Sequence, residues 1–341
     1  MATLREIADR ASVSVATASR VLNGSGVGHP VSPAVSEIVN AVAAELGYTP
    51  SAPARALREQ RSRIIGVIVS DILDPYFGEM TRAIEIEAGR LGYATVVANA
   101  SRDAEQERAK FALLREHQAS GIIFCGSDIE GSPGTAELAR EVTAAVRQGT
   151  RVVALAPRGF ESTQIVVDNR RTAQDLTSHL LALGHREIVF VGGIPGLTAA
   201  EQRIRGYVDV VREAGLVPRV IGLEGLTQEA GQRAMAGLID AGRMPDAVLC
   251  SNDEVAIGTL AALWAARLHA PEDISVAGIG GTRVGRLFDL TTMQLPLAEL
   301  GTLATAYIAA PSPAALVPDT PHSVLRHGAT SAPAHRDRAE G

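Results

Sequence analysis

The sequence predicts a protein of the α/β class, in which a small helical module precedes a much larger region of alternating strands and helices. Apolar residues recur at helical spacing over roughly the first fifty residues, which predicts short helices there. From Arg63 onward, short apolar runs alternate with amphipathic stretches. Such alternation is typical of parallel sheets covered by helices on both faces. The 341 residues leave room for a core that buries a large apolar area.

The first two expected helices lie very close together in the chain. Thr3 can cap the first helix, and Glu6 can complete a capping box three residues later. Ser12 and Val13 then form a tight turn, and Ser14 can cap the second helix. This spacing predicts a helix-turn-helix, a motif whose second helix places the residues of its early turns in the major groove of DNA.

A third helix is expected to begin at Ser32-Pro33, because proline is favoured at the first helical position, and Gly47 follows its last turn. Three short helices are too small a module for much chemistry, but they suit the presentation of one helix to DNA. The stretch 48–53 is rich in proline and serine and predicts a linker. Residues 54–60 are good helix formers, although so short a helix does not hold together alone in water.

The remaining elements follow from the alternating pattern of the larger region. So many alternating elements favour two sheets over one. Strands are expected at 64–69, 93–98, 121–125, 151–156, 187–192, 219–223, 246–250 and 274–279, and helices at 76–91, 104–117, 135–148, 171–183, 200–214, 228–241 and 253–268.

Composition limits the cellular setting. No apolar stretch reaches the length of a membrane span, and the N-terminus lacks the apolar segment of a signal peptide. Cys125 and Cys250 each end an apolar run, so we expect two buried thiols at strand ends, with no disulfide and no metal site. We therefore expect a cytoplasmic protein without a membrane partner. The net charge is −6, whereas residues 1–63 carry seven arginines and five acidic residues, which predicts only modest non-specific affinity for DNA.

Two sets of short motifs extend along almost the whole chain. The first set is Thr3–Ala8, Val13-Ser14, Ser19–Gly24, Val31–Pro33 and Glu45–Tyr48. The second set is Ile65–Val69, Asp74–Phe77, Leu183–Arg186, Arg203–Tyr207, Ser251–Asp253 and Leu290–Thr292. In these motifs and in their order the chain resembles the lac-repressor/galactose-repressor (LacI/GalR) family of regulators, over residues 3 to 330.

The resemblance implies a helix-turn-helix headpiece with a hinge helix, followed by two Rossmann-like subdomains of periplasmic-binding-protein type. The leucine helix that makes tetramers in the family is not recognisable, so a homodimer is expected. The expected parts are a headpiece at 1–49, a linker and hinge helix at 50–62, a core at 63–330 and a disordered tail at 331–341, with the N-subdomain at about 63–160 and 293–318 and the C-subdomain at about 161–291 and 319–330.

The resemblance places the candidate contacts to double-stranded DNA on the second helix. Arg20 can donate two hydrogen bonds to guanine, worth about 1–3 kcal/mol of discrimination, or can contact a phosphate instead. Val15 and Ala16 occupy the positions that set sequence preference in the family; they can contact thymine methyl groups or exclude other bases, or they can pack in the core. Short polar side chains suit phosphate contacts. The headpiece candidates are Thr3, Ser14, Val15, Ala16, Thr17, Ser19, Arg20 and Asn23.

The resemblance also implies that Leu57 of the hinge helix wedges into the minor groove at the centre of a palindromic operator. Ala54 would permit close approach, and Arg55 and Arg58 would contact neighbouring phosphates. Such a wedge kinks one base step, most easily a pyrimidine–purine step. The alternative role of Leu57 is packing on the core.

For the larger region, the resemblance implies a small-molecule effector, such as a sugar, that binds between the subdomains and changes operator affinity. Two acids that commonly bind sugar hydroxyls in the family are replaced here by Gly280 and Pro157. A neutral monosaccharide bound in the usual way is therefore not expected, and an anionic ligand, a less polar metabolite or no effector remain open. The candidate effector contacts are Ser70, Tyr76, Phe77, Arg203 and Asn252.

Two other functions are weaker interpretations of the sequence. Glycine clusters at 192–196 and 278–285 could suit a dinucleotide in an enzyme, but neither fits the pattern G-x-G-x-x-G after a strand, and no other catalytic motif is present. A sugar-binding module alone would not carry the helical module. The sequence therefore predicts a dimeric repressor of a carbohydrate operon without catalytic, cofactor or metal sites, and activation in place of repression stays open.

Overall fold

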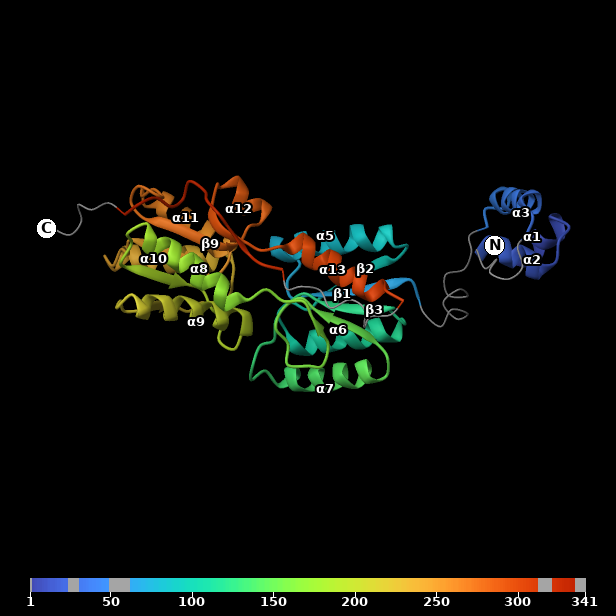
Figure 1. Cartoon of the computed structure of the whole chain (residues 1–341), viewed down its shortest axis with the longest axis horizontal. Helices are drawn as coiled ribbons and strands as arrows, with labels where there is room; N and C mark the ends of the chain where they lie inside the picture. The colour runs from blue at the N-terminus through green and yellow to red at the C-terminus, as the bar shows by residue number, and fades with distance from the viewer. Residues whose placement is uncertain (1, 24–30, 49–61, 312–320, 335–341) are drawn as a thin grey trace. The chain divides into compact units, whose positions relative to one another are not determined.

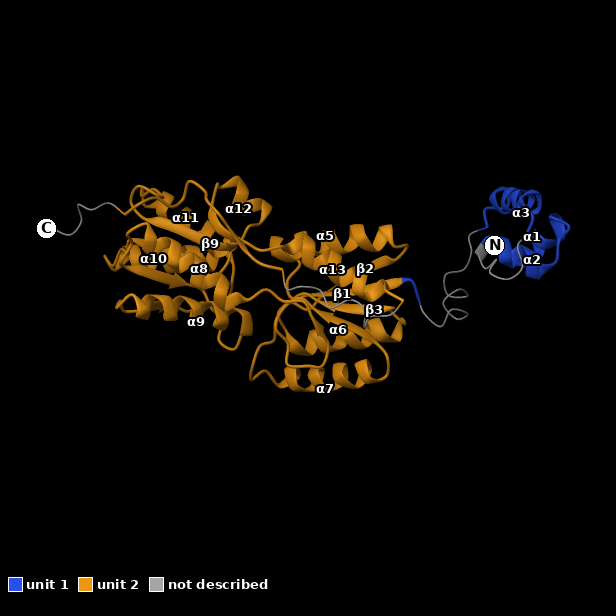
Figure 2. Ribbon diagram, viewed as in Figure 1, with its two compact units in different colours: residues 1–63 blue, residues 64–341 orange. Residues whose placement is uncertain are grey.

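The computed structural model describes residues 2–23, 31–48, 62–311 and 321–334 of the chain. They belong to two compact units, residues 1–63 and residues 64–341 (Figure 2). No helix within these described ranges is long and apolar enough to cross a membrane. The expected hinge helix, with its candidate residues Ala54, Arg55, Leu57 and Arg58, lies outside the described residues.

The first unit contains the three helices that the sequence predicts. The hydroxyl of Thr3 accepts a hydrogen bond from the backbone nitrogen of Glu6, and that of Ser32 accepts one from Val35, so both expected caps form. All three helices contribute to one small core, with Ile7, Ala8, Ala11, Ala18, Val39 and Ala43 buried. The helices are α1 (Leu4–Arg10), α2 (Val15–Asn23) and α3 (Pro33–Glu45).

The second unit contains two sheets, and the first is entirely parallel, with the strand order β2-β1-β3-β4-β5. Helices α5 and α13 pack together on one face, and α6 and α7 pack together on the other (Figure 1). These elements form the first subdomain. They are β1 (Ile64–Val69), α5 (Pro75–Arg90), β2 (Ala94–Asn99), α6 (Ala104–Glu116), β3 (Gly121–Phe124), α7 (Pro133–Arg147), β4 (Arg151–Ala154), β5 (Thr163–Gln164) and α13 (Leu297–Ala309).

The second sheet has the strand order β11-β10-β9-β8-β6-β7 and is parallel except for β11. Helix α8 packs with α9, and α10 packs with α11. These elements form the second subdomain. They are α8 (Asn169–Ala182), β6 (Ile188–Val191), α9 (Thr198–Glu213), β7 (Arg219–Ile221), α10 (Gln228–Asp240), β8 (Ala247–Cys250), α11 (Asp253–Ala265), β9 (Ser275–Gly280), α12 (Arg283–Leu287), β10 (Thr291–Gln294) and β11 (Val324–Arg326).

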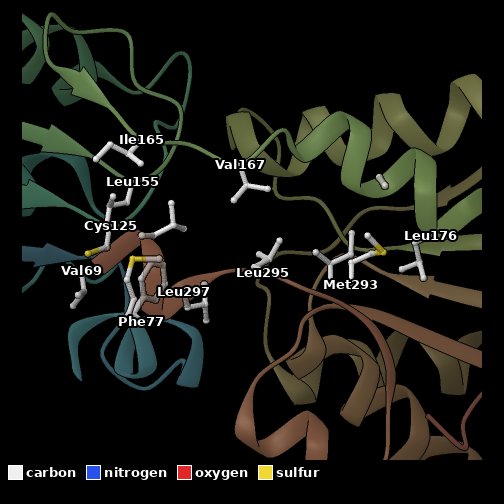
Figure 3. Close-up of a cluster of buried hydrophobic side chains, with 14 of the residues drawn as sticks. Val69, Phe77, Cys125, Leu155, Ile165, Val167, Leu176, Met293, Leu295 and Leu297 are labelled. Carbon is white, nitrogen blue, oxygen red and sulfur yellow. The ribbon is translucent and has the colours of Figure 1, made fainter. Parts of the chain in front are cut away.

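The chain crosses between the sheets a few residues later than the sequence indicated. Strand β5 pairs with β4, so the first subdomain extends to Gln164, and β10 pairs with β9, so the second extends to Gln294. The crossing residues are buried: Ile165, Val167 and Leu295 belong to an apolar cluster that continues from one subdomain into the other (Figure 3). The core therefore runs through the connection between the subdomains.

The two-sheet α/β architecture is confirmed, but some helices and strands were not predicted from the sequence pattern. Strands β5, β10 and β11 and helix α12 are short, and α13 is rich in apolar residues without a clear polar face. The disordered tail was expected from Ser331, and this is wrong for residues 331–334. The backbone nitrogen of Ala334 donates to the carbonyl of Leu183 (2.8 Å), and Nε2 of His185 lies 3.0 Å from the carbonyl of Ala332, so this segment is bound to the second subdomain.

Candidate DNA-binding helix and ligand cleft

The turn before α2 determines how this helix begins. Ser12 has a φ of 54°, in the left-handed region that a serine can adopt in a turn. The hydroxyl of Ser14 accepts a hydrogen bond from the backbone nitrogen of Thr17 (3.0 Å) and lies 2.8 Å from the Thr17 hydroxyl. This cap starts α2 at Val15, as the sequence predicts.

The first turn of α2 directs its side chains away from the core of the module. Val15 is 42% exposed and Ala16 is also exposed, which excludes core packing as their main role. Ala18 is buried instead, and Val21 and Leu22 pack against the same core. The two positions that the sequence assigned to base reading are therefore accessible.

The other headpiece candidates differ in exposure: Thr3 and Ser14 are exposed, whereas Arg20 is partly buried. Nε of Arg20 donates to the carbonyl of Ala16 (3.3 Å), while Thr17 and Ser19 are half-buried. The hydroxyl of Thr3 is engaged as a helix cap. The side chain of Asn23 lies outside the described residues.

All five expected effector contacts line one cavity in the second unit, and they come from both subdomains. Ser70 follows β1, and Tyr76 and Phe77 lie in the first turn of α5; Arg203 belongs to α9, and Asn252 precedes α11. The cavity thus lies at the carboxyl ends of parallel strands, the usual binding edge of such sheets. Its further polar lining, which sequence reasoning missed, is Asp74, Arg102, Ser127, Ser251, Asp253, Glu254 and Thr282.

Arg203 is held in the cavity by neutral oxygen atoms. Its Nε donates to Oδ1 of Asn169 (2.9 Å), and its Nη1 donates to the carbonyl of Ser251 (2.5 Å). Burial lowers the pKa of the guanidinium, and the nearby carboxylates of Asp253 and Asp74 offset this effect only in part. Arg203 forms no ion pair with a described residue.

Tyr76 and Asn252 offer different groups to a ligand. Burial raises the pKa of Tyr76 to about 12, so its phenol stays neutral and can donate a hydrogen bond. Asn252 caps α11: its Oδ1 accepts from the backbone nitrogen of Val255 (2.9 Å), and its Nδ2 donates to the carbonyl of Leu226 (3.1 Å). One amide hydrogen of Asn252 thus remains for a ligand.

The two most buried carboxylates of the cavity have partners within the protein. Asp74 accepts hydrogen bonds from the backbone of Tyr76 (3.0 Å) and from Arg102 (3.3 Å). Asp253 accepts from the backbone (2.7 Å) and hydroxyl (2.9 Å) of Thr282 and from the hydroxyl of Thr292 (2.7 Å). Burial raises the pKa of both carboxyl groups, against these hydrogen bonds.

The position of the first missing acid, Gly280, has no space for a side chain. A Cβ atom there would lie 2.9 Å from Oδ2 of Asp253, closer than a carbon atom normally approaches. Asp253 therefore occupies the volume that a side chain at residue 280 would need.

The second missing acid, Pro157, precedes a buried ion-pair cluster. The side chain of Arg158 is only 1% exposed and pairs with Glu107 (2.5 Å) and Asp128 (3.0 Å). Its guanidinium carbon lies 5.1 Å from the ring centroid of Phe124. Burial by itself would lower the pKa of Arg158, but the two carboxylates outweigh it and raise this pKa.

Several contacts join the subdomains next to the cavity, among them a hydrogen bond from the backbone nitrogen of Ala199 to the hydroxyl of Ser127 (3.4 Å). An antiparallel bridge links Ile129 of the first subdomain to Leu197 of the second. On helix α5, Glu79 accepts a hydrogen bond from the backbone nitrogen of Arg283 and lies 3.6 Å from the guanidinium of Arg286. The subdomains are therefore connected by their surfaces as well as by the crossing chain.

The two cysteines of the second unit lie at strand ends. Cys125 and Cys250 are free and buried, as predicted, and burial raises the pKa of each thiol to about 12. Thiols with so high a pKa are poor nucleophiles and metal ligands at neutral pH. Within the described residues, no group of three His, Cys, Asp or Glu side chains could hold a metal ion.

Comparisons with known proteins agree with this geometry. Residues 62–311 match the family of periplasmic binding proteins and sugar binding domains of the LacI family, and residues 3–51 match the bacterial regulatory proteins of the lacI family. The chain is 32% identical to the transcriptional repressor CytR of Escherichia coli K12, over 88% of this chain and 86% of that protein.

Two further similarities extend over nearly the same length. The ribose operon repressor of Halalkalibacterium halodurans is 32% identical, over 89% of this chain and 88% of that protein. The crystal structure of the lac repressor dimer bound to operator and an anti-inducer has a TM-score of 0.85 and 25% identity, covering 97% of this chain and 99% of that one. The chain therefore belongs to the lacI family of bacterial regulatory proteins, and it is a DNA-binding transcriptional regulator rather than an enzyme.

Proposed function

We propose that this regulator is a homodimeric repressor of an operon of carbohydrate metabolism, and that a small molecule in the cavity between its subdomains changes its affinity for a palindromic operator. The observation that carries this proposal is the exposed first turn of α2, in a chain whose second unit has a polar cavity lined from both subdomains. The ribose operon repressor and the operator-bound lac repressor dimer support the type of target and the dimer. The regulator would act in the cytoplasm, where its operator is.

In this proposal the headpiece reads DNA through a few side chains. Val15 and Ala16 contact base edges by shape and by thymine methyl groups, and Arg20 reaches a guanine. Thr3, Ser14, Thr17, Ser19 and Asn23 contact phosphates and fix the register of the headpiece on the duplex. In the linker, Leu57 enters the minor groove, Ala54 permits its approach, and Arg55 and Arg58 contact the neighbouring phosphates.

The cavity supplies the control. Ser70, Tyr76 and Phe77 come from the first subdomain, and Arg203 and Asn252 come from the second. A ligand that contacts both sets stabilises one relative angle of the subdomains more than another. By linkage, it shifts the population between states with high and low operator affinity.

The proposal is tested by selection from a pool of random DNA duplexes with the purified full-length protein, followed by sequencing. We expect an enriched palindrome with a pyrimidine–purine step at its centre, because a wedge kinks such a step most easily. The Arg20→Ala variant should lose preference at one position in each half-site, whereas Arg10→Ala, a matched change on α1 where Arg10 pairs with Glu45, should keep the wild-type preference. A failure to enrich any sequence, with and without added metabolites, would contradict the proposal.

Leu57→Ala tests the proposed wedge separately. We expect operator affinity to fall by about 2 kcal/mol, because the unstacking of a base step and the contacts that follow from it are worth a few kcal/mol. The melting temperature should stay at the wild-type value. Full operator affinity in this variant would exclude the wedge.

A further inference from the structure

The charged groups of the cavity are unequally matched. Asp74 is paired with Arg102, and Asp253 accepts hydrogen bonds from two threonines. Arg203, in contrast, donates only to a side-chain amide oxygen and a backbone carbonyl, although burial lowers the pKa of its guanidinium. A partly buried cation without an ion-pair partner among the described residues favours a ligand that brings a negative charge.

Two more polar groups of the cavity lack partners within the described residues. Ser251 is fully buried, and its hydroxyl has no hydrogen-bond partner, although its own carbonyl accepts from Arg203. Glu254 accepts from Gln228 through Oε2 (2.9 Å), whereas its Oε1 is buried without a partner. The Ser251 hydroxyl, which lies against Gly192, is thus a donor in the cavity wall, and Oε1 of Glu254 is an acceptor on α11, that a ligand could satisfy.

Helix α9 adds to the positive potential at this place. It begins in the cavity wall with Ala199 and Ala200, and its first amides have acceptors in the first subdomain: the backbone nitrogen of Thr198 donates to the carbonyl of Asp128 (3.1 Å), and that of Ala199 donates to the hydroxyl of Ser127 (3.4 Å). The amide groups at a helix N-terminus carry partial positive charge and favour anions. The helix dipole of α9 therefore adds to the positive potential around Arg203, whereas the amides of Thr198 and Ala199 are not available to an anion.

We propose that the effector is a hydroxylated anion, whose carboxylate or phosphate group pairs with Arg203 and accepts from the Ser251 hydroxyl, and one of whose hydroxyl groups donates to Glu254. This inference rests on the proposed function, because it defines the ligand of the regulatory cavity. Position 280 contributes no carboxylate to the cavity, because it is a glycine and the side chain of Asp253 fills the space beside it. Sugar acids and sugar phosphates share the required chemistry.

The experiment measures the melting temperature of the full-length protein with equal concentrations of D-glucuronate, D-glucose 6-phosphate, inorganic phosphate or D-glucose, at constant ionic strength set with sodium chloride. We expect D-glucuronate or D-glucose 6-phosphate to raise the melting temperature more than inorganic phosphate does, and D-glucose to leave it unchanged. Comparison of the shifts with D-glucuronate and with D-glucose 6-phosphate distinguishes a sugar acid from a sugar phosphate. Stabilisation by D-glucose equal to that by D-glucuronate, or stabilisation by none of the anions, would overturn the proposal.

Variants of α9 show whether Arg203 is the anion site. For the stabilising anion, Arg203→Gln should raise the dissociation constant at least tenfold, and Arg203→Lys should weaken binding less because it keeps the charge. Arg205→Gln is the matched control: Arg205 is exposed, pairs with Glu201 and should bind the anion like the wild type. Equal affinity of Arg203→Gln and the wild type would overturn the proposal.

Operator binding without any probe, measured on the same preparations, separates the two proposals. Wild-type protein that binds an operator but no anion overturns the anionic effector alone. Wild-type protein that binds no operator contradicts the proposed function, whatever the anions do. A single cooperative melting transition of the Arg203→Gln variant without anion, with the Arg205→Gln variant as reference, shows whether a loss of anion binding results from misfolding.

Discussion

Two arginines of the second unit, the buried Arg158 and the partly buried Arg203, show how the surroundings of one residue type decide its task. Arg158 lies between the carboxylates of Glu107 and Asp128, whose charges raise its pKa despite burial. Arg203 has only neutral oxygen atoms as hydrogen-bond acceptors, and burial lowers its pKa. The first guanidinium is satisfied by the fold, whereas the second is left for a ligand.

The contrast teaches that counter-ions, more than burial, distinguish a stabilising arginine from a binding one. A buried ion pair is costly to break, because the remaining partner stays uncompensated in a medium of low polarity. A partly buried cation with only neutral partners keeps most of its interaction energy available for an anion. The two arginines should therefore respond differently to mutation.

The largest expected effect comes from breaking the cluster around Arg158. Glu107→Ala should lower the free energy of unfolding by about 3–5 kcal/mol, the usual cost of removing one partner from a buried ion pair. Urea unfolding of the full-length protein measures it. Glu105→Ala on the same helix removes an exposed partner of Arg108 and should cost less than about 1 kcal/mol. Equal losses of stability in the two variants would show that the buried pair of Glu107 and Arg158 contributes no more than an exposed ion pair.

Arg203→Ala should have a smaller effect on stability. We expect a loss of about 1–2 kcal/mol in urea unfolding, because two acceptors lose a donor while an unpaired, partly buried charge is also removed. The response of operator binding to an effector should disappear, with operator affinity in its absence unchanged. A loss of stability as large as that of Glu107→Ala, or a normal response to the effector, would show that Arg203 serves the fold.

The smallest expected effect concerns two histidines of the second subdomain. Burial lowers the pKa of His179 and His185 below the usual 6.5. The unfolded chain then binds protons more readily than the folded one, so this contribution to stability is present above about pH 6.5 and is lost as the pH falls toward the lowered pKa.

The measurement is the free energy of unfolding between pH 7.5 and 5.5. His185→Gln, which keeps a donor for the carbonyl of Ala332, should show a weaker decrease over this range than the wild type. His117→Gln changes an exposed histidine and should keep the wild-type decrease. If all three proteins lose stability equally, the burial of His185 does not contribute to the pH dependence.

Local signals made the headpiece and the positions of the cavity residues predictable. The caps at Thr3, Ser14 and Ser32 depend on neighbours three residues away, which the sequence displays directly. Ser70 directly follows a predicted strand, and Asn252 lies just after another, at the edge where parallel strands present their ligands. In these places the residues that form the sequence pattern are the same neighbours that determine the local structure.

Pairings between distant residues were not predictable. Glu107, Asp128 and Arg158 come together only because β3, β4 and α6 pack as they do, and nothing in their sequence spacing indicates it. Asp253 stood in a recognised motif, but its filling of the space beside Gly280 depends on the packing of α11 against β9. The unmatched charge of Arg203 is likewise a property of the assembled cavity.

The contacts that join the subdomains next to the cavity, such as those from Ile129 to Leu197 and from Glu79 to Arg286, have a consequence for the speed of the response. A ligand that alters the angle between the subdomains has to wait until such contacts break. The observed rate of effector association should then level off at high effector concentration, at the rate of spontaneous opening, well below the diffusion limit. The delay between the appearance of a metabolite and the change in transcription would be set by the protein itself, and no longer by the supply of the metabolite.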